Sequence, residues 1–162
     1  MPIGAVSTSA VILEPVTSMN PPTLVGRTFN GNPMAMAAGN PVLGFLVENR
    51  QLYDVLAARG DLLRSSFNQR AKPMGLPATM TRVGPLFQTH LVPPPVMRPC
   101  DLLGQDKEAL RDFQLFLRFN GVFIPQVPPE VLSTEHNAED MEEVIRVHRV
   151  SLEACQAGDH AE

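Results

Sequence analysis

The chain has 162 residues, of which 44% are hydrophobic and 19% are charged, a balance typical of a globular protein with a buried core. Its net charge of -4 argues against binding to nucleic acid or to an anionic membrane surface, because both kinds of site are rich in basic residues. No apolar run approaches the roughly 20 residues that span a membrane, and no signal segment is visible, so we expect a cytoplasmic protein. The two distant cysteines, Cys100 and Cys155, are expected to be reduced thiols.

The first part of the chain is predicted to contain one helix. The sequence before Gly26 looks irregular, because short apolar stretches are interrupted by prolines. Asn32 and Pro33 are typical of the cap and the first position of a helix, and the helix that follows should end near Glu48. It is apolar on nearly all sides, so we expect it to be largely buried, and Pro41 should kink or interrupt it.

The rest of the chain alternates helical and extended patterns. Apolar residues at helical spacing predict a helix over residues 52–71, and β-branched residues predict a strand pair or a bent strand over residues 79–92. A further helix over residues 106–120 should be followed by a short strand over residues 122–124. A last helix should begin at Asn137, which is a good cap. This order predicts a small α/β domain.

Three motifs occur in an order and at a spacing that a generic domain does not explain. They are G-R-T-F-N-G-N-P-M-A-M-A-A-G from Gly26, G-V-F-I-P from Gly121 with L-S-T-E-H-N-A-E-D from Leu132, and the weaker P-I-G-A from Pro2. Together they resemble the C-terminal portion of class III pyridoxal-phosphate (PLP)-dependent aminotransferases, most closely glutamate-1-semialdehyde 2,1-aminomutase. The segment that begins at Ser9, S-A-V-I-L-E-P-V, also resembles a much earlier part of these enzymes, but that alignment would require an internal deletion.

The resemblance implies an α/β fold: the C-terminal small α/β domain of a fold type I PLP-dependent transferase, plus the terminal segment of its large domain. Residues 1–48 would be the terminal segment of the PLP-binding large domain, with the cofactor-phosphate loop and a linking helix. Residues 49–157 would be the small domain, and residues 158–162 a tail.

The resemblance also implies a cofactor-binding loop. In the family the threonine of the G-T-F loop contacts the PLP phosphate of the other subunit, and Thr28 matches it, with Arg27 and Asn30 as supporting candidates. Arg27 stands where the aminomutases have glycine, so it could add a cation near the phosphate or hinder a close backbone approach. Backbone amides at a helix N-terminus together with a hydroxyl suit an anion. From the residues alone, the same loop could simply form a turn and cap the helix.

The resemblance places the family's Schiff-base lysine just before Met1. The chain's only lysines, Lys72 and Lys107, look like surface residues, and we expect no catalytic residue and no metal site in this chain. We therefore expect a fragment that contributes the phosphate loop and the small domain but is inactive alone, in an enzyme acting on an amino acid or an amino-aldehyde such as glutamate-1-semialdehyde. The alternative is a catalytically inactive stand-alone dimerisation or binding module derived from the family.

The expected partner is a second copy of the chain or an N-terminal aminotransferase half. At the position of Ser133 and Thr134, ornithine-type aminotransferases carry an arginine that binds the substrate carboxylate. Its absence favours the aminomutase branch, although the two residues could also form a simple turn. His136 matches a family histidine and is expected to be structural, whereas His90 and His148 should be packing or surface residues.

Overall fold

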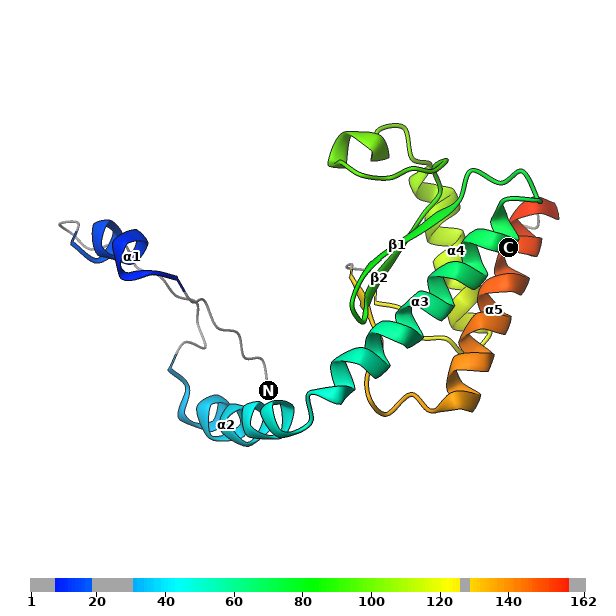
Figure 1. Cartoon of the computed structure of the whole chain (residues 1–162). Helices are drawn as coiled ribbons and strands as arrows, with labels where there is room; N and C mark the ends of the chain where they lie inside the picture. Colours follow the sequence, from blue (N-terminus) through cyan, green and yellow to red (C-terminus); the bar gives the residue numbers. More distant parts are fainter. Residues whose placement is uncertain (1–7, 19–30, 126–128, 158–162) are drawn as a thin grey trace. The chain divides into compact units, whose positions relative to one another are not determined.

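The computed structural model describes residues 8–18, 31–125 and 129–157. The chain divides into two compact units, residues 1–50 and residues 51–162 (Figure 1). Each unit is described by itself below. Among the described residues, no helix is long and apolar enough to cross a membrane.

The first unit contains a short helix that the sequence analysis did not predict. Helix α1 spans Ala10–Thr17, so the prediction of irregular chain is wrong for these residues. Ala10, Leu13 and Glu14 are good helix formers, and they support a helix in spite of Pro15. The missing N–H of Pro15 removes one backbone hydrogen bond near the end of this helix, where the loss is tolerated.

Helix α2 spans Pro33–Glu48 and begins as predicted. The Asn32 side chain accepts a hydrogen bond from the Ala35 N–H at 3.1 Å, and Pro33 occupies the first turn. The helix is continuous through Pro41, so of the predicted kink or interruption the interruption does not occur.

The prediction that α2 is largely buried is also wrong, because only Ala35 and Gly39 are buried. Six of its large apolar side chains are at least half exposed, and Leu46 is partly buried. The unit has too little chain to enclose a 16-residue helix on all sides. The exposed apolar residues of this helix are Met34, Met36, Val42, Leu43, Phe45 and Val47.

The second unit is a small α/β domain, as predicted. Helix α3 spans Gln51–Ala71 and leads into strands β1 (Thr79–Val83) and β2 (Leu86–His90), which pair antiparallel. After the short 3-10 helix η1 (Pro99–Leu102) come α4 (Lys107–Phe119), β3 (Glu130–Val131) and α5 (Ala138–Ala157). The strand order is β1-β2-β3, and β3 pairs antiparallel with β2.

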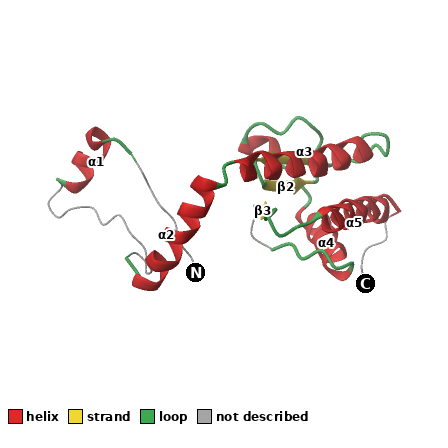
Figure 2. Ribbon diagram, turned by 60° about the horizontal axis from the view of Figure 1, so that its bottom comes forward, coloured by secondary structure: helices red, strands yellow, loops and turns green. Residues whose placement is uncertain are grey.

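The helices of this domain pack on the sheet and on one another. Helix α3 contacts β1, β2 and α5, and α5 also contacts α4 (Figure 2). The core forms where the apolar faces of these elements meet, because each helix and the sheet bury one face. Its buried apolar residues include Leu63, Phe67, Met80, Phe113, Leu117, Val147 and Leu152.

Side-chain caps are present at the starts of the last two helices, and the one at Asn137 was predicted. The Asp106 carboxylate accepts from the backbone N–H groups of Glu108 and Ala109, both at 3.0 Å. At the start of α5, Asn137 and Asp140 bond reciprocally, each side chain accepting from the backbone N–H of the other. Such reciprocal bonds satisfy donors that the first turn leaves unpaired.

Two details of the extended segments differ from the prediction. Residues 122–124 do not form a strand; instead, the Ile124 carbonyl accepts two hydrogen bonds from the Arg118 guanidinium, at 2.9 and 2.6 Å. The third strand is β3, which the sequence analysis missed. A strand of two residues is too short to show an alternating pattern.

Side chains cover parts of both edges of the β1–β2 hairpin. On the β1 edge, the Asn68 amide accepts from the Met80 N–H at 2.8 Å and donates to the Met80 carbonyl at 3.1 Å. On the β2 edge, the Glu130 carboxylate accepts from the Thr89 N–H. Exposed strand edges invite pairing with other strands, and both contacts occupy groups that such pairing would use.

Candidate functional site

The three predicted cofactor-binding residues, Arg27, Thr28 and Asn30, lie outside the residues that the structure describes. The structure therefore leaves their assignment a prediction. It does describe the chain that follows them directly, from Gly31 into helix α2.

The N-terminus of α2 has a geometry suited to an anion-binding loop. Gly31 has a φ of 68°, a left-handed conformation that glycine adopts without strain, and it turns the chain into the Asn32 cap. The first turn carries no acidic side chain, so nothing there opposes the positive end of the helix dipole. The donors expected of the preceding loop, a threonine hydroxyl and backbone amides, are groups that bind phosphate. The described residues are therefore compatible with a phosphate at this position.

The two lysines of the chain lie at helix ends on the surface. Lys72 follows the last residue of α3, and Lys107 is the first residue of α4. Both are exposed, as predicted. A lysine that forms a covalent bond with a cofactor is usually desolvated or held beside other charged groups, and neither setting is found here.

The turn at Ser133 and Thr134 is held by an arginine that the sequence analysis did not single out. Arg59 of α3 donates from one guanidinium nitrogen to the carbonyl oxygens of both residues, at 3.4 Å each. Within the turn, the Ser133 N–H donates to Nδ1 of His136 at 2.9 Å, and the Ser133 hydroxyl accepts from the Glu135 N–H. His136 is therefore a structural residue of this turn, as expected.

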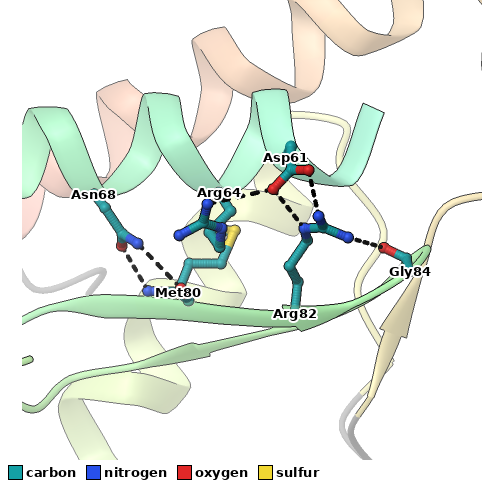
Figure 3. Close-up of polar contacts among 6 residues, drawn as sticks. All are labelled: Asp61, Arg64, Asn68, Met80, Arg82 and Gly84. Atoms are coloured by element: carbon teal, nitrogen blue, oxygen red, sulfur yellow. Dashed lines mark hydrogen bonds and ion pairs between the residues drawn. The ribbon is translucent and has the colours of Figure 1, made fainter. Parts of the chain in front are cut away.

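A polar network joins α3 to β1 (Figure 3). The Asp61 carboxylate accepts from Arg82 through two guanidinium nitrogens and from Arg64 at 3.3 Å. Hydrogen bonding from Arg82 is the main cause that holds the pKa of Asp61 below its ordinary value. Arg82 also donates to the Gly84 carbonyl at 3.3 Å. Because Arg82 belongs to β1 and Asp61 to α3, their ion pair fastens the hairpin to the helix.

The backbones of α3 and the hairpin turn approach closely beside this network. A Cβ atom placed on Gly60 would lie 2.6 Å from the Gly84 carbonyl oxygen. Only glycine leaves enough room at this position of the helix, so Gly60 is required for packing.

The buried histidines are packing residues, as expected. His148 donates from Nδ1 to the Val144 carbonyl at 2.7 Å, and the rings of Phe67, Phe87 and Phe113 meet it edge-on at 6.1 to 6.3 Å. Burial lowers the pKa of His148 to about 4, so the ring is neutral at physiological pH. His90 contacts the Thr81 hydroxyl at 2.9 Å, and burial lowers its pKa too. Among the described residues, no group of three potential ligands could hold a metal.

Comparison with known proteins identifies relatives along almost the whole chain. No family model matches. The chain is 33% identical over 158 residues to the glutamate-1-semialdehyde 2,1-aminomutase of Methanobrevibacter smithii, which covers 96% of this chain and 36% of that protein. It is 32% identical over 154 residues to the enzyme of the same name from Thermus thermophilus, covering 94% and 36%. The chain thus spans about a third of the length of the curated relatives it matches.

Solved structures agree with these relatives. An omega-transaminase from Sphaerobacter thermophilus is 26% identical, with a TM-score of 0.64, over 83% of this chain and 31% of that one. A transaminase with PLP bound has a TM-score of 0.65 over 85% of this chain and 31% of that one; at 22% identity it shows a shared fold only. The named relatives of this chain are thus glutamate-1-semialdehyde 2,1-aminomutases, which are class III PLP-dependent aminotransferases, and the chain is similar to about one third of such an enzyme.

Proposed function

We propose that the chain forms part of a PLP-dependent aminotransferase or aminomutase, to which it contributes a phosphate loop and the small α/β domain. The observation that carries this proposal is the similarity to glutamate-1-semialdehyde 2,1-aminomutases along 96% of the chain. The substrate would be an amino acid or an amino-aldehyde such as glutamate-1-semialdehyde.

The proposed role of the loop is to hold the phosphate of PLP. The Thr28 hydroxyl would donate a hydrogen bond to the phosphate, and Arg27 and Asn30 would add a positive charge and a further donor. The cap at Asn32 supports this role, because it starts α2 immediately after the loop and directs the helix dipole toward it. When bound, PLP supplies an electron sink for charge that develops on the substrate.

The amine that attaches PLP would come from outside these 162 residues. Lys72 and Lys107 are both exposed at helix ends, far from the setting in which a lysine becomes a nucleophile. The chain alone should therefore neither bind PLP covalently nor transfer an amino group. Borohydride reduction in the presence of PLP, followed by mass spectrometry, tests this: PLP on either lysine in preference to the N-terminal amine would contradict the proposal.

The turn at Ser133 and Thr134 supports a substrate of the aminomutase kind. It offers no arginine side chain of its own, and Arg59 is bonded to its carbonyl oxygens. An arginine so engaged holds the turn, which leaves this position without the carboxylate-binding arginine of ornithine-type enzymes.

A chimeric enzyme provides the decisive experiment. The third of the Thermus thermophilus aminomutase that matches this chain would be replaced by the chain itself. We expect the chimera to retain PLP and to convert glutamate-1-semialdehyde. A chimera that binds PLP but transfers amino groups only between other substrates would refute the proposed substrate. It would still support a role in a PLP-dependent aminotransferase.

Two variants at Thr28 test the loop within that chimera. Thr28→Val removes the hydroxyl at similar volume, and the lost hydrogen bond to a charged phosphate, about 1.5–3 kcal/mol, should weaken PLP binding about tenfold or more. Thr28→Ser keeps the hydroxyl and should bind PLP nearly as well as the unchanged chimera. Equal PLP affinity in all three proteins would show that Thr28 does not contact the phosphate.

The exposed apolar side chains of α2 favour a second candidate function, that of an inactive dimerisation module. Six large apolar side chains of this one helix are at least half exposed, a surface that associates with other apolar surfaces in water. We would expect the purified chain to form dimers by light scattering, and Phe45→Asp to yield monomers. Tyr53→Asp, an equally exposed aromatic position on α3, serves as the control. If the unsubstituted chain is already monomeric, the hypothesis of a dimerisation module is refuted.

A further inference from the structure

The small domain contains a cavity that the proposed function does not use. It has a volume of about 230 Å³ and lies between the chain entering β1 and helices α4 and α5. Its larger apolar wall residues are Leu76, Leu91, Phe113, Phe116 and Leu152. These residues all belong to the second unit, so the cavity is formed within this domain.

The cavity extends from the surface of the domain to its core. Three of its wall residues, Phe113, Ser151 and Leu152, are at most 1% exposed. Leu76 and Phe116 are only partly buried, so the cavity has a rim at the surface where a molecule can enter. Sites for small molecules are typically concave, mostly apolar and largely formed before the ligand binds.

The polar side chains of the wall already have partners within the chain. The Ser151 hydroxyl donates to the Val147 carbonyl at 2.8 Å, and the Asp106 carboxylate caps α4 by accepting from two backbone N–H groups. Asp112 also has an interaction partner of its own. A polar or charged ligand would compete with these interactions, whereas the apolar wall surface is open to contact.

The thiol of Cys155 indicates how poorly this wall solvates a charge. Cys155 lines the cavity, and burial is the main cause that raises the pKa of its thiol, to which the nearby Asp112 charge adds. A thiol pKa that is raised by burial means that the charged form lacks the stabilisation that water would give it. A charged ligand would lose its hydration in the same surroundings, which is costly without a matching partner.

The volume of the cavity limits the size of its occupant. An apolar cavity of about 150 Å³ in another protein stays dry and binds benzene. A volume of about 230 Å³ therefore leaves room for one six-membered ring with a short substituent.

We propose that this cavity binds a small neutral apolar molecule of about the size of one substituted ring. The apolar wall would supply the binding energy, because the ligand removes its own apolar surface and that of the wall from water. The site shares no residue with the phosphate loop, so it does not depend on the proposed role in PLP binding.

Three probes that each contain one six-membered ring test the selection on the full chain. Toluene, benzylammonium and benzoate would be titrated separately at pH 7 while backbone amide NMR shifts are followed. We expect saturable shifts around Ala78, Ala109 and Ala154 with toluene, and binding of both charged probes that is weaker by roughly tenfold or more. Equal binding of the three probes, or no saturable binding of toluene, would overturn the proposal.

Matched variants locate the binding. Ala154→Leu adds side-chain volume to the cavity wall and should abolish toluene binding. Ala58→Leu, the same change at an exposed position of α3 outside the cavity, should leave it unchanged. Phe116→Ala removes a ring from the partly exposed side of the wall and should weaken toluene binding, and far-UV circular dichroism verifies that each variant is folded. Undiminished toluene binding in folded Ala154→Leu or Phe116→Ala protein would refute the site.

The two cysteines give a second readout within one molecule. Cys155 lines the cavity, whereas Cys100 is exposed on η1 and lies outside it. Toluene should slow alkylation of Cys155 by iodoacetamide and leave Cys100 unaffected, as peptide mass spectrometry would show. Equal alkylation rates at Cys155 with and without toluene would mean that toluene does not occupy this cavity.

Discussion

Glu130 places a carboxyl group inside the small domain, and its ionisation should control stability. The residue is only 3% exposed, on β3 opposite Phe87 of β2. Its carboxylate accepts from the backbone N–H groups of Thr89 and of Glu130 itself, while Oε2 has no hydrogen-bond partner among the described residues. Burial outweighs these bonds and raises the pKa of Glu130 from its ordinary 4.5 to about 7.

The sign of the effect follows from the two pKa values. The folded protein favours the neutral carboxyl, so the stability that it contributes is fully present below pH 4.5, where the unfolded chain also holds the proton. That stability is lost as the pH rises through the folded-state pKa of about 7. At about 1.4 kcal/mol per pKa unit, the loss reaches about 3 kcal/mol.

Glu130→Gln removes the ionisation and keeps the shape, with a carbonyl that can still accept from the Thr89 N–H. Urea unfolding of both proteins would be followed by circular dichroism at pH 5, 6, 7 and 8. The free energy of unfolding of the variant, minus that of the unchanged protein, should rise by about 2.5 kcal/mol between pH 5 and pH 8. Glu139→Gln, an exposed control on α5, should give a flat difference. A flat difference for Glu130→Gln as well would refute the reasoning.

Three further changes test other parts of the domain. Asn68→Ala leaves the N–H and carbonyl of Met80 without their side-chain partners, and urea unfolding should show a loss of about 2 kcal/mol. Gly60→Ala should lower the thermal unfolding midpoint, because the clash with the Gly84 carbonyl outweighs the gain of about 1 kcal/mol in helix propensity. Burial lowers the pKa of His148 to about 4, so the ring is neutral in the folded protein at physiological pH. The stability that the neutral ring contributes is fully present above pH 6.5 and is lost as the pH falls through 4. Unfolding measured from pH 7 to pH 4 should therefore be less pH-dependent in His148→Phe than in the unchanged protein.

Helix starts were predictable because they depend on neighbouring residues. Asn32, Asp106 and Asn137 each cap a helix through bonds to residues two or three positions away. Such contacts can be predicted from the local sequence, because only a few residue types make them. The order of the helices and the β1–β2 strand pair in the small domain followed from the same local patterns.

The exposure of α2 could not be read from its composition. An apolar helix is usually buried, but burial depends on what the rest of the chain can place against it. The sequence pattern of α2 indicates that its surface is apolar, but it does not indicate which other residues pack against that surface. Strand β3 was missed for a related reason, since two residues gain their strand character only by pairing with Leu86 and Phe87, more than 40 positions earlier.

The candidate functional residues also differ in whether the local sequence can predict them. Thr28 was proposed from a motif, and the fit of the residues after it rests on a local cap. Arg59 was not found, because it meets Ser133 across 74 positions of sequence and no motif marks such a contact.

The contacts that fasten the β1–β2 hairpin to α3 have a consequence for the order of folding. Asn68 and Met80 are 12 positions apart, and Asp61 and Arg82 are 21 apart, so only short loops must close to form them. Contacts of low sequence separation form quickly, so we expect residues 51–90 to form the folding nucleus of this domain. Helices α4 and α5 would then dock on a surface that already exists, with the Asn68 amide fixing β1 at one residue before the distant core contacts close.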